Sequence, residues 1–151
     1  MKSKNTQLCS AFPGTGKSYF YTVFGGIDGK IILDSDSSTF DKKDFPTNYI
    51  KHIKANIGKA DIIFISSHKE VRDALVKEGL HFNLVYPQPY LKENYIERYI
   101  ARNNAPAFVK LLEENWSSWI EELTNQLGCS HILLEVDQYI SEKEEILRWL
   151  K

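Results

Sequence analysis

The most informative part of the sequence lies close to the start of the chain and reads Ala11-Phe12-Pro13-Gly14-Thr15-Gly16-Lys17-Ser18. It follows the pattern G-x-x-x-x-G-K-[ST] of a phosphate-binding loop, with alanine in place of the first glycine. An apolar, strand-like run over residues 8–11 precedes it, and a helix-like run over residues 17–24 follows. A chance match in a polar loop would lack this order of strand, loop and helix, so the stretch predicts a site for a nucleoside triphosphate.

The residue types in this loop suit the chemistry of phosphate binding. Gly14 and Gly16 permit the tight turn that points successive backbone N–H groups at phosphate oxygens. Lys17 supplies a cation for the β- and γ-phosphates, and the Ser18 hydroxyl can ligate Mg²⁺. The helix after the loop turns its positive N-terminus toward the anion. We therefore expect the loop to bind ATP and Mg²⁺ through Pro13, Gly14, Thr15, Gly16, Lys17, Ser18 and Tyr19.

Length and composition restrict the possibilities further. A chain of 151 residues has room for one good core, so we expect a single domain over residues 1–151. A formal net charge of -1 does not mark the chain as a nucleic-acid or membrane binder. The polar start over residues 1–5 lacks the apolar core of a signal peptide, and no apolar stretch is as long as a membrane span. We therefore expect a cytoplasmic protein.

The pattern of apolar runs predicts an α/β fold with a parallel sheet. Short runs alternate with longer amphipathic ones, and the short runs are continuously apolar, as in strands covered on both faces. The expected strands are Gln7–Ala11, Lys30–Asp34, Asp61–Ser66, Phe82–Tyr86 and Ser130–Leu134. The expected helices are Lys17–Phe24, Tyr49–Ile57, Lys69–Lys77, Leu91–Asn103, Ala105–Gln126 and Ser141–Leu150.

Polar residues at the carboxyl ends of these strands are the candidates for chemistry, because ligands of open parallel sheets bind outside those ends. Asp34 and Asp36 follow the second strand, and Ser67 and His68 follow the third. Asp61 lies at the opposite end of its strand and is excluded from the site. The alternative for Asp34-Ser35-Asp36 is a turn or a helix cap, since Asp and Ser favour both.

A phosphate-binding loop after the first strand, followed by Asp34-x-Asp36 after the second, resembles the shikimate and gluconate kinase branch of the nucleoside-monophosphate-kinase-like fold. The resemblance implies a three-layer P-loop fold, with a five-stranded parallel sheet in the order 2-3-1-4-5 and a short helical lid. It also implies that Asp34 supports the metal together with Ser18, and that Asp36 holds the accepting hydroxyl. Phosphoryl transfer requires both a positioned Mg²⁺ and an oriented acceptor.

A second resemblance concerns residues 95–104, which look like the arginine-bearing lid helix of nucleoside monophosphate kinases, within a lid of about residues 90–106. Arg98 and Arg102 are four residues apart, which puts both guanidinium groups on one helical face. Two cations there would neutralise charge on the transferring phosphoryl group. The alternative is an ordinary solvated helix surface.

Further features carry predictions of their own. Arg72, by position in related kinases, would grip the acceptor, or else be a surface arginine beside Asp73. The pair Trp116 and Trp119 favours packing of the long helix over a platform for a nucleobase. The adenine pocket is expected near residues 135–138 by analogy only. Cys9 and Cys129 are expected to be free thiols, and no cluster predicts a structural metal site.

Together these features predict an ATP-dependent kinase with Lys17, Asp36, Arg98 and Arg102 as catalytic residues. The acceptor site is expected to use Asp34, Asp36, Ser67 and Arg72. The short polar region after Asp36 favours a small acceptor, a nucleoside or nucleoside monophosphate, as the partner. Two alternatives stay open: transfer to a polynucleotide hydroxyl, with nucleic acid as substrate, and a nucleotide-binding regulatory module with little turnover.

Overall fold

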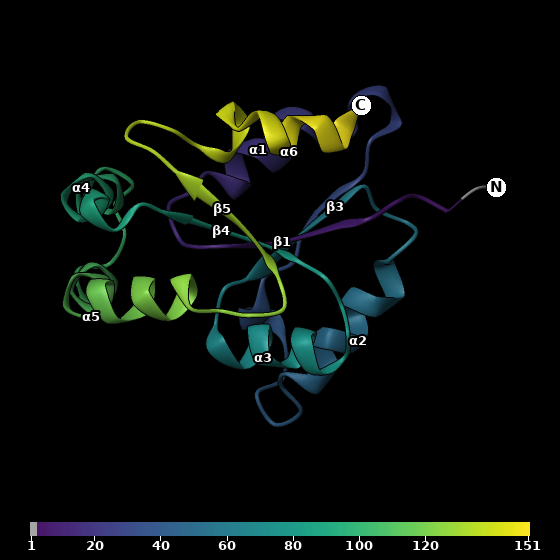
Figure 1. Ribbon diagram of the computed structural model, residues 1–151, viewed down its shortest axis with the longest axis horizontal. Helices are drawn as coiled ribbons and strands as arrows, with labels where there is room; N and C mark the ends of the chain where they lie inside the picture. The colour runs from purple at the N-terminus through teal and green to yellow at the C-terminus, as the bar shows by residue number, and fades with distance from the viewer. Residues whose placement is uncertain (1–2) are drawn as a thin grey trace.

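The computed structural model describes residues 3–151 and is built around one parallel sheet (Figure 1). The sheet order is β2-β3-β1-β4-β5, and every neighbouring pair is parallel. The expected α/β class and the expected order 2-3-1-4-5 are therefore confirmed. The strands are β1 (Gln7–Ala11), β2 (Ile32–Asp34), β3 (Ile62–Ser66), β4 (Asn83–Pro87) and β5 (Ser130–Leu134).

The α-helices follow the expected sequence, with small shifts at most ends. They are α1 (Lys17–Phe24), α2 (Thr47–Asn56), α3 (Lys69–Lys77), α4 (Lys92–Ala101), α5 (Pro106–Thr124) and α6 (Glu144–Leu147). The largest difference concerns the last helix, which was expected over residues 141–150. Only α6 is α-helical there, because Tyr139 and Glu142 close a separate 3-10 turn and Lys143 is extended before α6 begins.

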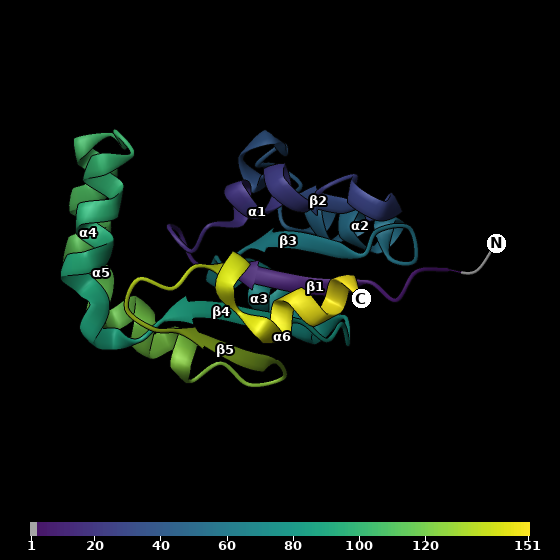
Figure 2. The ribbon, with the colours of Figure 1, turned by 90° about the horizontal axis from the view of Figure 1, so that it is seen from above.

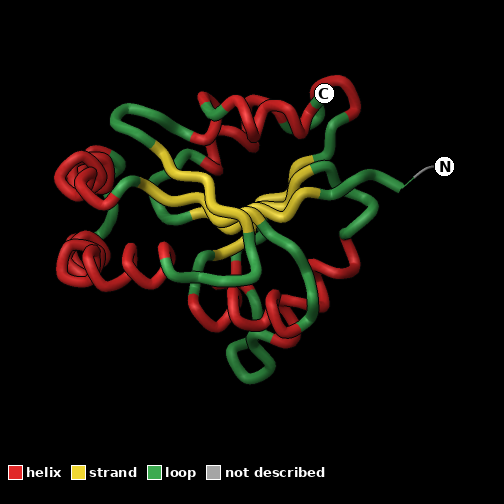
Figure 3. Tube along the Cα trace, viewed as in Figure 1, coloured by secondary structure: helices red, strands yellow, loops and turns green. Residues whose placement is uncertain are grey.

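Helices cover both faces of the sheet. The strands form a central layer, with α1 and α6 on one face and α2, α3 and part of α5 on the other (Figures 1 and 3). Helices α4 and α5 lie side by side beyond the carboxyl ends of the strands, and Figure 2 shows this hairpin from above. This cover explains why the strand sequences are continuously apolar rather than alternating.

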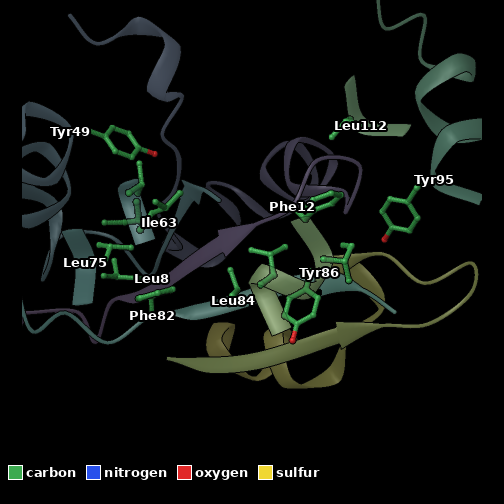
Figure 4. Packing of buried hydrophobic residues seen from close by; sticks show 14 of the residues in the cluster. Leu8, Phe12, Tyr49, Ile63, Leu75, Phe82, Leu84, Tyr86, Tyr95 and Leu112 are labelled. Carbon is green, nitrogen blue, oxygen red and sulfur yellow. The ribbon is translucent and has the colours of Figure 1, made fainter. Parts of the chain in front are cut away.

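Successive strand residues supply two separate cores. In β3, Ile63 and Ile65 belong to the core beneath α2, α3 and α5, whereas Ile62 and Phe64 belong to the core beneath α1 and α6. This alternation follows from the two-residue repeat of a strand. Figure 4 shows the first core, which runs from the Tyr49 region past β1 and β4 to Tyr95 of α4.

The predicted packing role of the tryptophan pair is confirmed. Trp116 is buried, its ring meets the edge of Phe12 at 5.6 Å between centroids, and its indole N–H donates to the carbonyl of Pro89 at 2.9 Å. Trp119 is partly buried against the same core. Trp116 therefore fixes the long helix to the sheet and offers no face to a nucleobase.

Both cysteines are free thiols: Cys9 is buried in β1, where burial raises the pKa of its thiol, and Cys129 is half-buried before β5. From Ser3 to Lys151, no helix combines the length and apolar character that crossing a bilayer requires. Met1 and Lys2, which open the polar start, lie outside the described residues.

Asp61 anchors the edge of the sheet opposite to the phosphate-binding loop, as its position before β3 predicted. Its Oδ2 accepts a hydrogen bond from the Ile31 N–H at 2.8 Å and pairs with the Lys4 ammonium at 3.0 Å. Burial opposes ionisation of Asp61, but these two partners outweigh it and hold the pKa of the carboxyl below its usual range. The carboxylate therefore stabilises the fold.

We predict that Asp61→Ala lowers the free energy of unfolding by about 1–3 kcal/mol, because the Ile31 N–H loses its acceptor. Asp61→Asn keeps an acceptor oxygen and should lose less. Urea denaturation measures both. Since the folded pKa of Asp61 is depressed, its contribution is present above the ordinary value of 3.8 and fades as the pH falls through the lower folded pKa. Equal stability of the parent and Asp61→Ala at pH 7 would contradict this assignment.

Candidate functional site

The phosphate-binding loop joins β1 to α1 and has the backbone that its glycines predict. Gly14 and Gly16 adopt left-handed conformations, with φ of 86° and 96°. Gly16 is also the N-cap of α1, and no side chain caps this helix end. The first N–H groups of α1 are therefore left without a side-chain acceptor, which is the arrangement that binds an anion.

Three successive carbonyls of the loop are each held by a distant segment. The Tyr99 hydroxyl donates to the carbonyl of Pro13 at 2.8 Å, and the Arg98 guanidinium donates to that of Gly14 at 2.8 Å. The N–H of Ile140 donates to the carbonyl of Thr15 at 2.9 Å. Helix α4 and the segment after β5 thus fix the shape of the loop from outside.

Close packing leaves no room for side chains at the two loop glycines. A Cβ on Gly14 would lie 2.8 Å from Tyr99 Cε1, and one on Gly16 would lie 3.0 Å from Tyr139 Cδ1. Thr15 is fully buried and its hydroxyl donates to the Phe12 carbonyl at 2.8 Å, so its side chain supports the loop rather than facing a ligand. Tyr19 in the first turn of α1 is 62% exposed and borders the pocket.

Lys17, Ser18 and Asp34 come together at the end of β2, as the sequence predicted. The Lys17 ammonium lies 3.4 Å from Asp34 Oδ1, and the Ser18 hydroxyl lies 3.4 Å from Asp34 Oδ2. Asp34 Oδ1 is buried and accepts no hydrogen bond from the described residues. The ion pair with Lys17 is long, so this oxygen can still accept a bond from a ligand or a metal ion.

These residues fit a magnesium ion that accompanies a nucleotide. Mg²⁺ prefers oxygen ligands and is usually held by one or two protein groups together with substrate phosphates and water. Asp34 Oδ1 and the Ser18 hydroxyl are such groups. Between Ser3 and Lys151, no cluster of three or more His, Cys, Asp and Glu side chains could hold a metal by itself.

A pocket of about 920 Å³ opens above the loop. Its size lies within the range of small-molecule sites. The carboxyl ends of β1, β2 and β3 meet at this edge, which is where the ligand of an open parallel sheet is expected. Besides loop residues, its lining includes Asp36, Ser37, Ser38, Ser66, Ser67, His68, Arg98, Ala101, Arg102, Phe108, Tyr139, Ser141 and Glu142.

Asp36 caps a turn, which is the alternative role that the sequence allowed, and it also borders the pocket. Its Oδ1 caps the 3-10 turn Ser37–Thr39 by accepting the Ser38 N–H at 2.9 Å, and its side chain also lines the pocket. The hydrogen bond from Ser38 lowers the pKa of the Asp36 carboxyl. Asp36 therefore presents an ionised carboxylate, held by this hydrogen bond, at the pocket.

Tyr49 of α2 fixes this wall of the pocket, a role that sequence reasoning missed. Its buried hydroxyl donates to the Ser35 carbonyl at 2.7 Å and accepts the Ser66 N–H at 3.1 Å. The Ser66 hydroxyl then donates to Ser37 Oγ at 2.7 Å. The ends of β2 and β3 are thereby joined. The sequence pattern placed Tyr49 in a helix, but it gave no indication of where the Tyr49 hydroxyl would bind.

The two lid arginines both line the pocket but differ in their surroundings. Arg98 lies between the rings of Tyr95 and Tyr139, at 4.3 and 3.9 Å from their centroids, in addition to its bond to the loop. Arg102 ends α4, is exposed and makes no hydrogen bond or ion pair with another described side chain. Arg98 is thus a fixed part of the loop's support, whereas Arg102 is available to a ligand.

Tyr139 is a second residue that sequence reasoning missed. It covers Gly16, stacks on Arg98 and lines the pocket together with Ser141 and Glu142. The adenine pocket was expected at residues 135–138, just before it. Those residues do not line the pocket; the Glu135 carboxylate accepts hydrogen bonds from Gln88 and Tyr90 instead.

Arg72 is not brought into the pocket, although it was predicted to grip the acceptor. It is 3% exposed, and its Nε donates to the Ser67 carbonyl at 2.8 Å. Its other nitrogens donate to Gln126 and Glu122 of the α5 region. The Arg72 side chain bonds to Ser67, five residues earlier in the chain, and its guanidinium faces the α5 region. Arg72 therefore supports the pocket wall from behind. Ser67 itself lines the pocket as predicted.

No protein-family model matches this chain, and no curated protein matches it in a sequence search.

The contrast between the two arginines gives a prediction. Arg98→Lys should weaken ATP binding and lower the melting temperature, because lysine cannot keep both the Gly14 bond and the stacking between two rings. Arg102→Lys should leave the melting temperature and ATP affinity within error. Calorimetry and thermal unfolding of the two variants measure the difference. Identical behaviour of the two variants in both measurements would contradict it.

Proposed function

We propose that this protein is an ATP-dependent kinase that transfers the γ-phosphate to a small acceptor, a nucleoside or nucleoside monophosphate. The observation that carries the proposal is the meeting of Lys17, Ser18 and Asp34 at the uncapped N-terminus of α1, with Asp36 on the same pocket. The resemblance to shikimate and gluconate kinases, and to the lid helix of nucleoside monophosphate kinases, supports the same reading.

The donor half of the site binds ATP in this proposal. The N–H groups of the loop and of the first turn of α1 bind the phosphate oxygens, and Lys17 leaves Asp34 to contact the β- and γ-phosphates. Mg²⁺, held by Ser18 and Asp34, supplies charge neutralisation on the phosphates. Arg102 reaches the phosphoryl group from the end of α4, where negative charge grows during transfer.

The acceptor half orients a hydroxyl or phosphate oxygen toward the γ-phosphorus. Asp36 accepts a hydrogen bond from the acceptor and keeps it in line. Phosphoryl transfer passes through a loose transition state, so positioning matters more than strong base catalysis. A carboxylate with a lowered pKa suits this positioning role.

Lys17 tests the donor half. Lys17→Ala should weaken MgATP binding strongly in calorimetry, because the β- and γ-phosphates lose their cation. Circular dichroism should be unchanged, since Lys17 is partly exposed and its pair with Asp34 is long. Lys30→Ala, a lysine outside the pocket, is the matched control. An ATP affinity of Lys17→Ala equal to that of the parent would contradict the assignment of this loop as a phosphate-binding loop.

Asp36 separates a kinase from a passive nucleotide binder. Asp36→Asn should keep ATP binding but reduce transfer on the order of a hundredfold. Because the pKa of Asp36 is below its ordinary value of 3.8, the carboxylate stays ionised at higher pH. The parent's kcat/KM should therefore show no loss from this group between about pH 5 and pH 8. Full activity of Asp36→Asn on the acceptor would refute its role, and ATP binding without transfer to any acceptor would refute the kinase proposal.

A further inference from the structure

The Arg72 guanidinium, which lies behind the acceptor wall of the pocket, is unavailable to a ligand. Arg72 follows the wall residues Ser67 and His68 by only a few positions, yet its guanidinium is buried and bonded at all three nitrogens. The charge of Arg72 is balanced by Glu122. Releasing it toward the pocket would break its hydrogen bonds to the Ser67 carbonyl and Gln126 and its pair with the partly exposed Glu122 carboxylate, which is unfavourable.

The acceptor wall consists instead of hydroxyl groups and one carboxylate. Ser37 and Ser38 follow β2, and Ser66 and Ser67 end and follow β3; all four line the pocket beside Asp36. His68 also lines it, and an imidazole can donate to or accept from a hydroxyl. Among the described residues between β2 and α2 and between β3 and α3, no lysine or arginine lines the pocket.

The other cations near the site are paired, lie outside the pocket, or are assigned to ATP in the proposed function. Lys17 pairs with Asp34, and Arg98 is bound to the loop. Lys42 and Lys43 are exposed and do not line the pocket, and Lys69 pairs with Asp73 at 2.6 Å. Arg102 and Lys17 face the four negative charges of ATP. A second phosphate group would therefore lie beside Asp36 without a cation of its own, an unfavourable arrangement for a desolvated dianion.

We infer that the acceptor is an uncharged alcohol, a nucleoside rather than a nucleoside monophosphate. This rests on the proposed function and names the substrate class of the same site. Serine hydroxyls and a carboxylate can satisfy sugar hydroxyls, and the apolar surfaces of Ala101 and Phe108 in the pocket suit the flat face of a base.

The nucleoside hydroxyl oxygen forms a bond to the γ-phosphorus of ATP, and the bond from that phosphorus to the β,γ-bridging oxygen breaks. ADP leaves with the bond's electron pair. The hydroxyl proton passes to the Asp36 carboxylate and then to water. The products are ADP and a nucleoside monophosphate.

The test measures transfer from γ-³²P-labelled MgATP to each common nucleoside and to its 5′-monophosphate, with the full chain. We expect kcat/KM to be at least about tenfold higher for the best nucleoside than for any monophosphate, the factor that one charge-assisted contact would supply. Preference for a monophosphate would overturn this inference and leave the proposed kinase function intact. Transfer to none of them, with MgATP still bound, would overturn both.

A charge-addition variant tests the physical reason. Ser38→Arg places a cation on the acceptor wall at an exposed position, and the Ser38 backbone N–H that caps Asp36 is retained. It should raise the kcat/KM for monophosphates, relative to the kcat/KM for nucleosides, by about tenfold. Ser117→Arg adds the same charge on the exposed face of α5, outside the pocket, and should leave the ratio unchanged. An unchanged ratio in Ser38→Arg would contradict the charge argument.

Discussion

The candidate site depends on how the carbonyls of the phosphate-binding loop are held. A loop that offers N–H groups to an anion must turn its carbonyls elsewhere, and each of those carbonyls needs a donor. Here the donors for Pro13, Gly14 and Thr15 are Tyr99, Arg98 and the N–H of Ile140. All three come from segments more than 80 residues further along the chain. The shape of the loop is therefore a property of the whole fold, and its two glycines are required by the rings packed against them.

This anchoring links the loop to α4, the helix expected to act as a lid. Tyr95 and Tyr99 of α4 are buried in the main core, and burial raises the pKa of Tyr95 to about 12. A helix so packed is part of the body of the protein over most of its length. Arg98 and Ala101 in the last turn of the helix, and Arg102 at its C-cap, line the pocket. The pocket-facing part of the lid is thus the last turn of the helix rather than its whole length.

The sequence predicted the fold well because the periodic signals are strong. Continuous apolar strands, a phosphate-loop motif and Gly or Pro breaks fix the order of elements, and the parallel sheet then brings Lys17, Ser18, Asp34 and Asp36 to one edge. The failures concern long side chains whose partners are remote in sequence. Arg72 turned toward Glu122 and Gln126, and Tyr49 and Tyr139 joined the site, through contacts that no local pattern encodes. The i, i+4 spacing of Arg98 and Arg102 likewise predicted a shared face but not their different partners.

Asp34 and Asp36, at and after the end of β2, lie in different positions because the backbone changes conformation between them. Asp34 is the last residue of β2, paired in register with Phe64, so its side chain is held at the sheet edge beside Lys17 and Ser18. Asp36 has left the sheet and caps a 3-10 turn, which fixes its carboxylate on the other wall of the pocket. The cap hydrogen bond lowers its pKa, which makes it a weaker base but a more constantly charged acceptor. In the kinase that we propose, a loose phosphoryl transition state would remove the acceptor's proton late, so constant charge and fixed position are the more useful properties at this position.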